Sequence, residues 1–252
     1  MRGPFILPIK VIYFVCSFYP GSSLNNLDQA GMEDPFEKVI YVLTSNSFQK
    51  WMLTQGSELD RLFYNCDMEA IGRQAFATHV WYQANPDPAW IKVWLLDMQS
   101  VGTDSVAVLM AGNNPHISQQ LHYIIGFMNV ATNAPPIQFK SVTVLKYNVQ
   151  CVTESANDSN TSQCLPGCDF KLLFPPSSGY QTAFVYNESN VLCVPIRASI
   201  EPVEVDQLDF SHGGNNVLGA GYSCDGQGLL FSVASGMITI QPSHQPSRDK
   251  SK

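Results

Sequence analysis

The residues of this chain that could do chemistry are a few cysteine, serine and histidine side chains. Cys164 and Cys168 form one closely spaced pair, and Cys151 lies thirteen residues upstream of Cys164. This spacing suggests a structural zinc site, but such a site needs four soft ligands, usually supplied as two pairs. Only one pair is present, and no histidine lies within forty residues of it in either direction. The sequence therefore predicts no metal site and no cofactor.

Two stretches near the C-terminus resemble parts of a hydrolase site. Ser211–Gly214 (SHGG) is similar to an oxyanion loop, and Gly221–Asp225 (GYSCD) is similar to a nucleophile elbow. The elbow motif requires glycine where Asp225 stands, and about ten residues leave no room for its strand–turn–helix. Gly219-Ala220-Gly221 opens a dinucleotide fingerprint, but Cys224 replaces the third glycine and no βαβ unit surrounds it. The five histidines have no obvious acidic partner in the sequence. We predict a turn between strands here, no enzyme, and no small-molecule substrate.

The elements around these residues are short apolar runs, joined in pairs by tight turns. Each run is five to eight residues long and rich in Val, Ile, Leu, Phe and Tyr, a pattern typical of β-hairpins. Hairpins that recur along a chain, with other strands between them, indicate radial repetition of small sheets. The fold prediction is all-β, a partial β-propeller of about four blades. The hairpins are Val39–Leu53, Val106–Phe127, Thr182–Pro195 and Gly228–Ile240.

One segment departs from the strand pattern. Asp67–Trp81 has its apolar residues at helical spacing and Asp67 as a good N-cap, which predicts a short inserted helix near 67–81. Asn85-Pro-Asp-Pro88 ends this helix, and a strand is expected over Trp90–Asp97. Large aromatics at strand positions usually fill gaps between sheets, so we expect packing roles for the tryptophans, with Trp51 buried in the core. The other tryptophans are Trp81, Trp90 and Trp94.

Composition narrows the class of protein. Hydrophobic residues make up 45% of the 252-residue chain and charged residues 14%, as in a globular protein. The net charge of −7 argues against direct nucleic-acid binding, which needs clustered Lys and Arg. Cys66 and Cys193 lie inside apolar runs, as reduced core cysteines do, whereas seven cysteines could also form disulfides in a secreted protein. Three glycosylation sequons keep that second interpretation open: Asn157, Asn160 and Asn187.

The expected domain organisation has three parts. Residues 1–36 are a poorly patterned leader and linker, residues 37–241 form the partial propeller, and residues 242–252 are a polar tail. Phe5–Tyr19 is apolar but interrupted by Pro8 and Lys10, and could be a signal peptide, a buried strand or a non-native leader. The polar loop Cys151–Cys168 is predicted to be a disordered insert.

Several motifs, in order, resemble the nucleoporin 133 family. The most specific are Tyr41–Trp51 (YVLTSNSFQKW), Tyr186–Val191 (YNESNV) and Val217–Gly221 (VLGAG). The similarity runs from about Lys38 to Ile240, some four-fifths of the chain, and covers the second half of the family's N-terminal β-propeller. These are packing and turn signatures, so their number and order carry the resemblance, and no contact residue of the family can be assigned here.

The resemblance implies a structural scaffold subunit of the Y-shaped coat complex of the nuclear pore, at the nuclear envelope. Its partners would be other coat subunits, in support of mRNA export and protein import. The family propeller has about seven blades and a helical C-terminal domain, so a truncated chain that aggregates when isolated is expected. An amphipathic membrane-sensing segment is not recognisable in Met1–Phe36, so membrane contact is not predicted. The alternative function is a secreted or lumenal β-rich glycoprotein.

Overall fold

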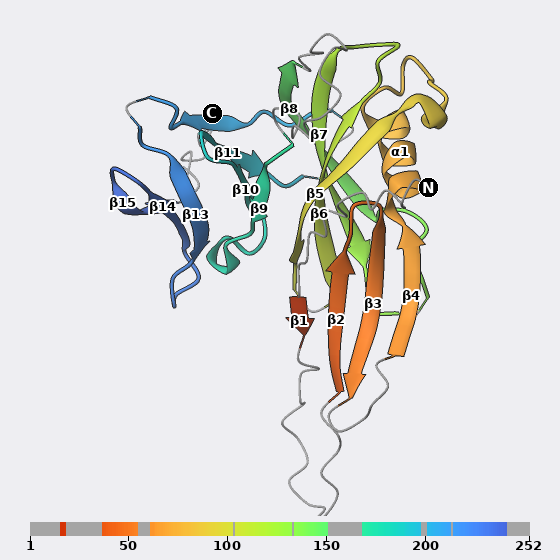
Figure 1. The fold of residues 1–252 in the computed structure, drawn as a ribbon, viewed down its shortest axis with the longest axis horizontal. Helices are drawn as coiled ribbons and strands as arrows, with labels where there is room; N and C mark the ends of the chain where they lie inside the picture. Colours follow the sequence, from red (N-terminus) through yellow and green to blue (C-terminus); the bar gives the residue numbers. More distant parts are fainter. Residues whose placement is uncertain are drawn as a thin grey trace, which may run out of the picture.

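The computed structural model describes residues 16–18, 37–54, 61–102, 104–132, 134–150, 168–197, 201–212 and 214–240. These ranges contain fifteen strands in four antiparallel sheets, one α-helix and two short 3-10 helices. The four sheets follow one another in chain order, from the red and orange strands to the blue ones (Figure 1). The predicted insert Cys151–Cys168 and the predicted tail lie almost entirely outside the described residues.

The first and second sheets are four-stranded meanders in which each strand pairs with its neighbour in sequence. The strands of the first sheet are β1 (Cys16–Phe18), β2 (Glu37–Leu43), β3 (Ser47–Thr54) and β4 (Arg61–Asp67). The strands of the second sheet are β5 (Lys92–Ser100), β6 (Ser105–Asn113), β7 (Gln120–Asn129) and β8 (Ser141–Gln150). Strand β1 lies within the range expected to be a leader, so the boundary after residue 36 stays a prediction.

The third and fourth sheets repeat this arrangement at smaller size. The strands of the third sheet are β9 (Lys171–Leu173), β10 (Thr182–Tyr186), β11 (Asn190–Pro195) and β12 (Asp206–Asp209), with the 3-10 helix η2 (Pro176–Ser178) between β9 and β10. The three strands of the fourth sheet are β13 (Val217–Tyr222), β14 (Gly228–Ser232) and β15 (Gly236–Ile240).

The four predicted hairpins are confirmed as β2–β3, β6–β7, β10–β11 and β14–β15. Local side chains shape their turns. The Thr44 hydroxyl accepts hydrogen bonds from the N–H groups of Asn46 (3.4 Å) and Ser47 (3.0 Å). The Asn187 side-chain oxygen does the same for Ser189 (3.0 Å) and Asn190 (2.8 Å). Threonine and asparagine favour turns because their side chains can replace missing backbone partners in this way.

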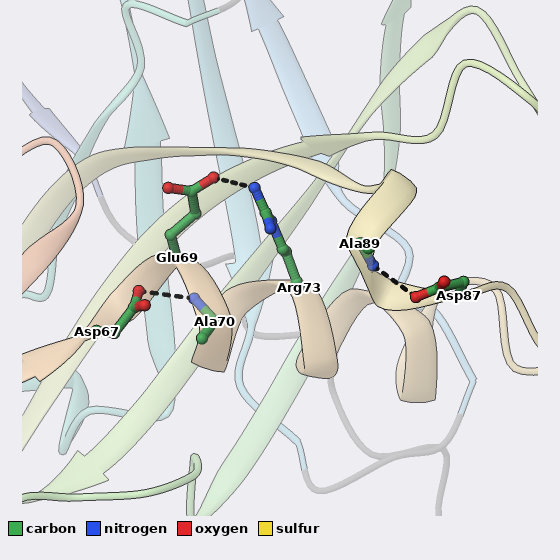
Figure 2. Close-up of polar contacts among 6 residues, drawn as sticks. All are labelled: Asp67, Glu69, Ala70, Arg73, Asp87 and Ala89. Carbon is green, nitrogen blue, oxygen red and sulfur yellow. Dashed lines mark hydrogen bonds and ion pairs between the residues drawn. The ribbon is translucent and has the colours of Figure 1, made fainter.

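The inserted helix is also confirmed, as α1 (Met68–His79). The Asp67 carboxylate accepts a hydrogen bond from the Ala70 N–H at 2.9 Å, and Glu69 forms an ion pair with Arg73 one turn later (Figure 2). The N-cap satisfies one of the unpaired N–H groups of the first turn, which fixes where the helix begins. The helix therefore starts directly where β4 ends, between the first and second sheets.

Two close contacts hold α1 against the second sheet. A Cβ atom at Gly72 would lie 2.9 Å from a Val93 methyl group, so only glycine allows this approach. A Cβ atom at Gly112 on β6 would lie 2.6 to 2.7 Å from the Phe76 ring, so the ring sits directly on the glycine backbone. Phe76 is fully buried. Close packing of this kind tolerates little added volume.

The sheets and apolar clusters alternate. The first cluster joins the first sheet, α1 and one face of the second sheet, and includes Phe48, Phe76, Met110 and Ile124. The second cluster joins the other face of the second sheet to the third sheet, and includes Leu109, Tyr123, Phe170 and Val185. The third cluster joins the third and fourth sheets, and includes Leu173, Phe184, Val217 and Leu230. Each of the two middle sheets is therefore covered on both faces, as the blades of a propeller are.

Two aromatic predictions are wrong. Pro88–Trp90 forms the 3-10 helix η1, whose Ala89 N–H is capped by Asp87 at 2.9 Å (Figure 2), and β5 begins only at Lys92. Trp90 therefore precedes the sheet and is 53% exposed. Trp51 is half-buried because the alternation of β3 turns Phe48 and Lys50 toward the core and Trp51 away from it. Trp81 is buried as expected, and Trp94 is half-buried.

Candidate interaction surfaces

The residues that suggested hydrolase chemistry lie in surface turns. Ser223 hydrogen-bonds the Asp225 carboxylate and accepts the Gln227 N–H at 3.0 Å, which closes the β13–β14 turn. His212 has an acidic neighbour that the sequence did not suggest, since its Nε2 lies 3.8 Å from Asp209. Both side chains are exposed, and the pair sits in the turn after β12. The predicted turn is confirmed, and Gly219–Gly221 lies within strand β13.

The cysteines of the described ranges behave as isolated thiols or lie near the edge of those ranges. Cys66 and Cys193 are free, and burial raises the pKa of Cys66 to about 11, which keeps that thiol protonated at neutral pH. Cys151 and Cys164 lie outside the described residues. Within the described ranges, no three His, Cys, Asp or Glu side chains come together as metal ligands would.

Polar contacts cross the seam between the first and second sheets at Lys50. Its ammonium group donates to the carbonyl oxygens of Val130 (2.9 Å) and Thr132 (3.0 Å), in the connection after β7. The Tyr41 hydroxyl donates to the same Val130 oxygen at 3.3 Å, and the ammonium lies 5.5 Å from the centre of the Phe63 ring. Lys50 is only 4% exposed, and this burial lowers its pKa. Its charge is therefore stabilised by carbonyl dipoles and an aromatic face.

The seam between the second and third sheets is built on side-chain acceptors from β5. The Asp97 carboxylate accepts the Leu172 N–H at 2.7 Å and the Met98 N–H at 2.6 Å, and Gln99 accepts the Phe174 N–H at 2.9 Å. Strand β9 is the edge of the third sheet, so these two alternate N–H groups on that strand need partners outside the sheet. Asp97 and Gln99 supply them, which protects this edge.

Backbone contacts strengthen the second seam and the third. Leu145 and Val203 form a parallel bridge, with the Val203 N–H donating to the Val144 carbonyl at 2.8 Å. Across the third seam, the Val217 N–H donates to the Glu188 carbonyl at 2.8 Å. Backbone or side-chain hydrogen bonds therefore cross each of the three seams, and fix the position of each sheet relative to the next.

The two end sheets each present one face away from this stack. On the first sheet, that face carries two cross-strand rows, which are Ile40–Trp51–Leu62 and Val42–Gln49–Asn65. On the fourth sheet, the rows are Gly219–Phe231–Met237 and Gly221–Leu229–Thr239. We call these surfaces the front face and the back face. None of the twelve residues is charged, and none belongs to an apolar cluster of the described residues.

The back face is the more exposed of the two. Met237 is 65% exposed and Phe231 43%, and Leu218 beside them is 72% exposed. A Cβ atom added at Gly219 or Gly221 would meet nothing within 4 Å, so strand β13 forms a shallow shelf next to Phe231. Apolar surface concentrated on one sheet face in this way is typical of an interaction site.

A smaller exposed apolar group lies beside α1. Trp90 packs against His116 with 4.7 Å between ring centres, and Tyr82 and Ile117 nearby in sequence are also exposed. These residues come from the connection after α1 and from the β6–β7 turn. No helix among the described residues is long and apolar enough to cross a membrane.

Four stacked antiparallel sheets with apolar end faces define a partial β-propeller, a class of fold that works by holding other surfaces. A solved structure supports this class. The chain superposes on the crystal structure of the Vanderwaltozyma polyspora Nup133 β-propeller domain with a TM-score of 0.56 and 15% sequence identity. The match covers 84% of this chain and 53% of that domain, and confirms the predicted all-β, partial-propeller fold.

The sequence comparisons agree with the structural one. The chain is similar to the nuclear pore complex protein Nup133 of Homo sapiens (25% identity over 206 residues), Drosophila melanogaster (23% over 208) and Mus musculus (24% over 212). The matches cover 79%, 82% and 80% of this chain, which spans 16% of the length of each relative. No family model matches the chain. The resemblance to the nucleoporin 133 family is therefore confirmed.

Proposed function

We propose that this chain is a structural scaffold element of the nuclear pore coat, at the nuclear envelope, that acts through protein–protein contacts. The observation that carries the proposal is the ordered similarity to Nup133 over about four-fifths of the chain, together with the Nup133 propeller fold. Transport of mRNA and protein would be supported indirectly, through the assembly that the scaffold holds. Other coat subunits are the proposed partners, with no substrate and no cofactor.

The described surface suits a scaffold. Its exposed apolar groups lie on the front face, the back face and the Trp90–His116 pair, and each of these is a side-chain surface for contact. The polar groups buried in the described seams are used to join sheets, and none of them opens onto a group of metal ligands. Such a molecule offers surfaces for other proteins.

The alternative function, a lumenal glycoprotein, makes different predictions about Asn187. Its side-chain oxygen accepts two turn N–H groups, and its amide nitrogen donates to Asp169 at 3.3 Å. A glycan on that nitrogen would disturb the bond to Asp169 next to β9. The scaffold proposal therefore favours an unmodified Asn187.

A fluorescently tagged full chain tests the proposal in cells. We expect a signal at the nuclear rim and co-purification of coat subunits. The matched control is Phe48→Asp, which puts a charge at a fully buried position and should abolish both signals by unfolding. Passage into the secretory pathway, a mass shift with an N-glycosidase, or cysteines protected from thiol titration under denaturing conditions would instead support the lumenal glycoprotein.

A further inference from the structure

The front and back faces have the same relation to each other as two sheets that are already in contact. Along the stack, the rear of each sheet packs on the front of the next through an apolar cluster. The back face is the rear of the fourth sheet, and the front face is the front of the first sheet. A back face placed on a front face would therefore repeat the stacking that the chain uses three times.

The back face also has a hollow that suits a large aromatic. On the second sheet, aromatic rings lie directly on glycine backbone: Phe76 on Gly112, and Phe139 on Gly126, where an added Cβ atom would lie 2.6 Å from the ring. Gly219 and Gly221 offer the same kind of position, and no atom covers them within 4 Å of an added Cβ. The front face supplies an aromatic of the right kind at its centre, Trp51.

The size of the arc indicates where that aromatic comes from. Four sheets of this chain match 53% of a propeller domain, so they supply about half of a ring. One further copy of the same arc would supply the other half. With two copies, each back face meets the partner's front face, and the ring closes with two identical contacts around a two-fold axis.

We propose that two copies of this chain associate through back-to-front contacts into a closed ring of eight sheets, with Trp51 of each copy seated on the Gly219–Gly221 shelf of the other. This inference goes beyond the proposed scaffold function and does not depend on it. The uncharged rows of both faces remove the desolvation penalty that charged residues would impose on the contact.

Multi-angle light scattering on the full chain tests the ring directly. The wild type should elute as a discrete dimer of twice 27.9 kDa. Trp51→Glu or Met237→Lys should each give a monomer, because each puts an unpaired charge into both contacts of the dimer. The matched control is Ile137→Lys, at an 84% exposed position outside both faces, which should leave the dimer unchanged. Circular dichroism confirms that each variant is folded, and Leu62→Glu replaces Trp51→Glu if that variant is not.

Mixing the two monomeric variants gives the decisive result. In a mixed dimer, one contact pairs the introduced Lys with the introduced Glu, and the other contact is wild type on both sides. We therefore expect the mixture to recover a dimer that neither variant forms alone. A wild-type monomer, an open series of oligomers, a variant-independent aggregate or a mixture that stays monomeric would each overturn the closed ring.

Discussion

Asp97 should make this protein more stable as the pH falls from 7 to 5, which is opposite to the usual behaviour of a paired carboxylate. The side chain is 3% exposed, and burial raises its pKa from 3.8 to about 6 despite the N–H groups of Leu172 and Met98. The folded state therefore binds a proton more readily than the unfolded state does. Stability contributed by this group falls as the pH rises through the interval between the two pKa values.

The size of the effect follows from the two pKa values. Between pH 7 and pH 5, a shift from 3.8 to about 6 changes the free energy of unfolding by about 1.3 kcal/mol. Asp97→Asn has nearly the same shape but does not titrate, so it lacks this term. Other ionisable groups contribute equally to both proteins and cancel in the difference.

Urea unfolding of wild type and Asp97→Asn at pH 7 and pH 5, at one protein concentration, measures the difference. We expect the wild type to gain about 1.3 kcal/mol relative to the variant at pH 5. A gain of zero, or a loss, would show that the two N–H groups hold the carboxylate ionised in the folded state, and the argument from burial would be wrong.

The other predictions concern packing and capping, and urea unfolding at pH 7 measures all of them. Gly112→Ala should cost about 1–3 kcal/mol, because its methyl group meets an aromatic ring at 2.6 Å, whereas Gly219→Ala should be nearly neutral in the monomer. Asp67→Ala should cost about 1 kcal/mol through loss of the N-cap, and no loss would mean that the cap is not needed. Phe48→Ala should cost about 3–5 kcal/mol, and half-buried Trp51→Ala clearly less. Equal costs would contradict the assignment of Trp51 to the front face.

The strands and the helix could be predicted because their signals are local. Alternating apolar runs with turn residues between them identified all four hairpins, and Asp67 with helical spacing identified α1. Trp90 was misplaced for an equally local reason. Pro88 favours the first turn of a helix, so the chain forms η1 there before β5 begins.

The seams could not be predicted, because their residues act over long sequence separations. Lys50 and Val130 are 80 positions apart, and Asp97 and Leu172 are 75 positions apart. In the sequence, each charge only interrupts an apolar run. A charge at a core position of a strand is a signal that some partner must exist, because an unsatisfied buried charge is very costly, but the pattern does not say which partner.

The placement of the two buried charges explains how the order of the sheets is fixed while the ends stay open to association. Lys50 needs the carbonyl groups after β7, and Asp97 needs the free N–H groups at the edge of β9. A sheet stacked in the wrong place would leave one of these charges buried without a partner, so the two inner seams select their neighbours. The front and back faces carry no charge and impose no such requirement. Their selectivity must therefore come from shape, and the unfilled shelf at Gly219 and Gly221 opposite a central Trp51 is the feature of shape that they have.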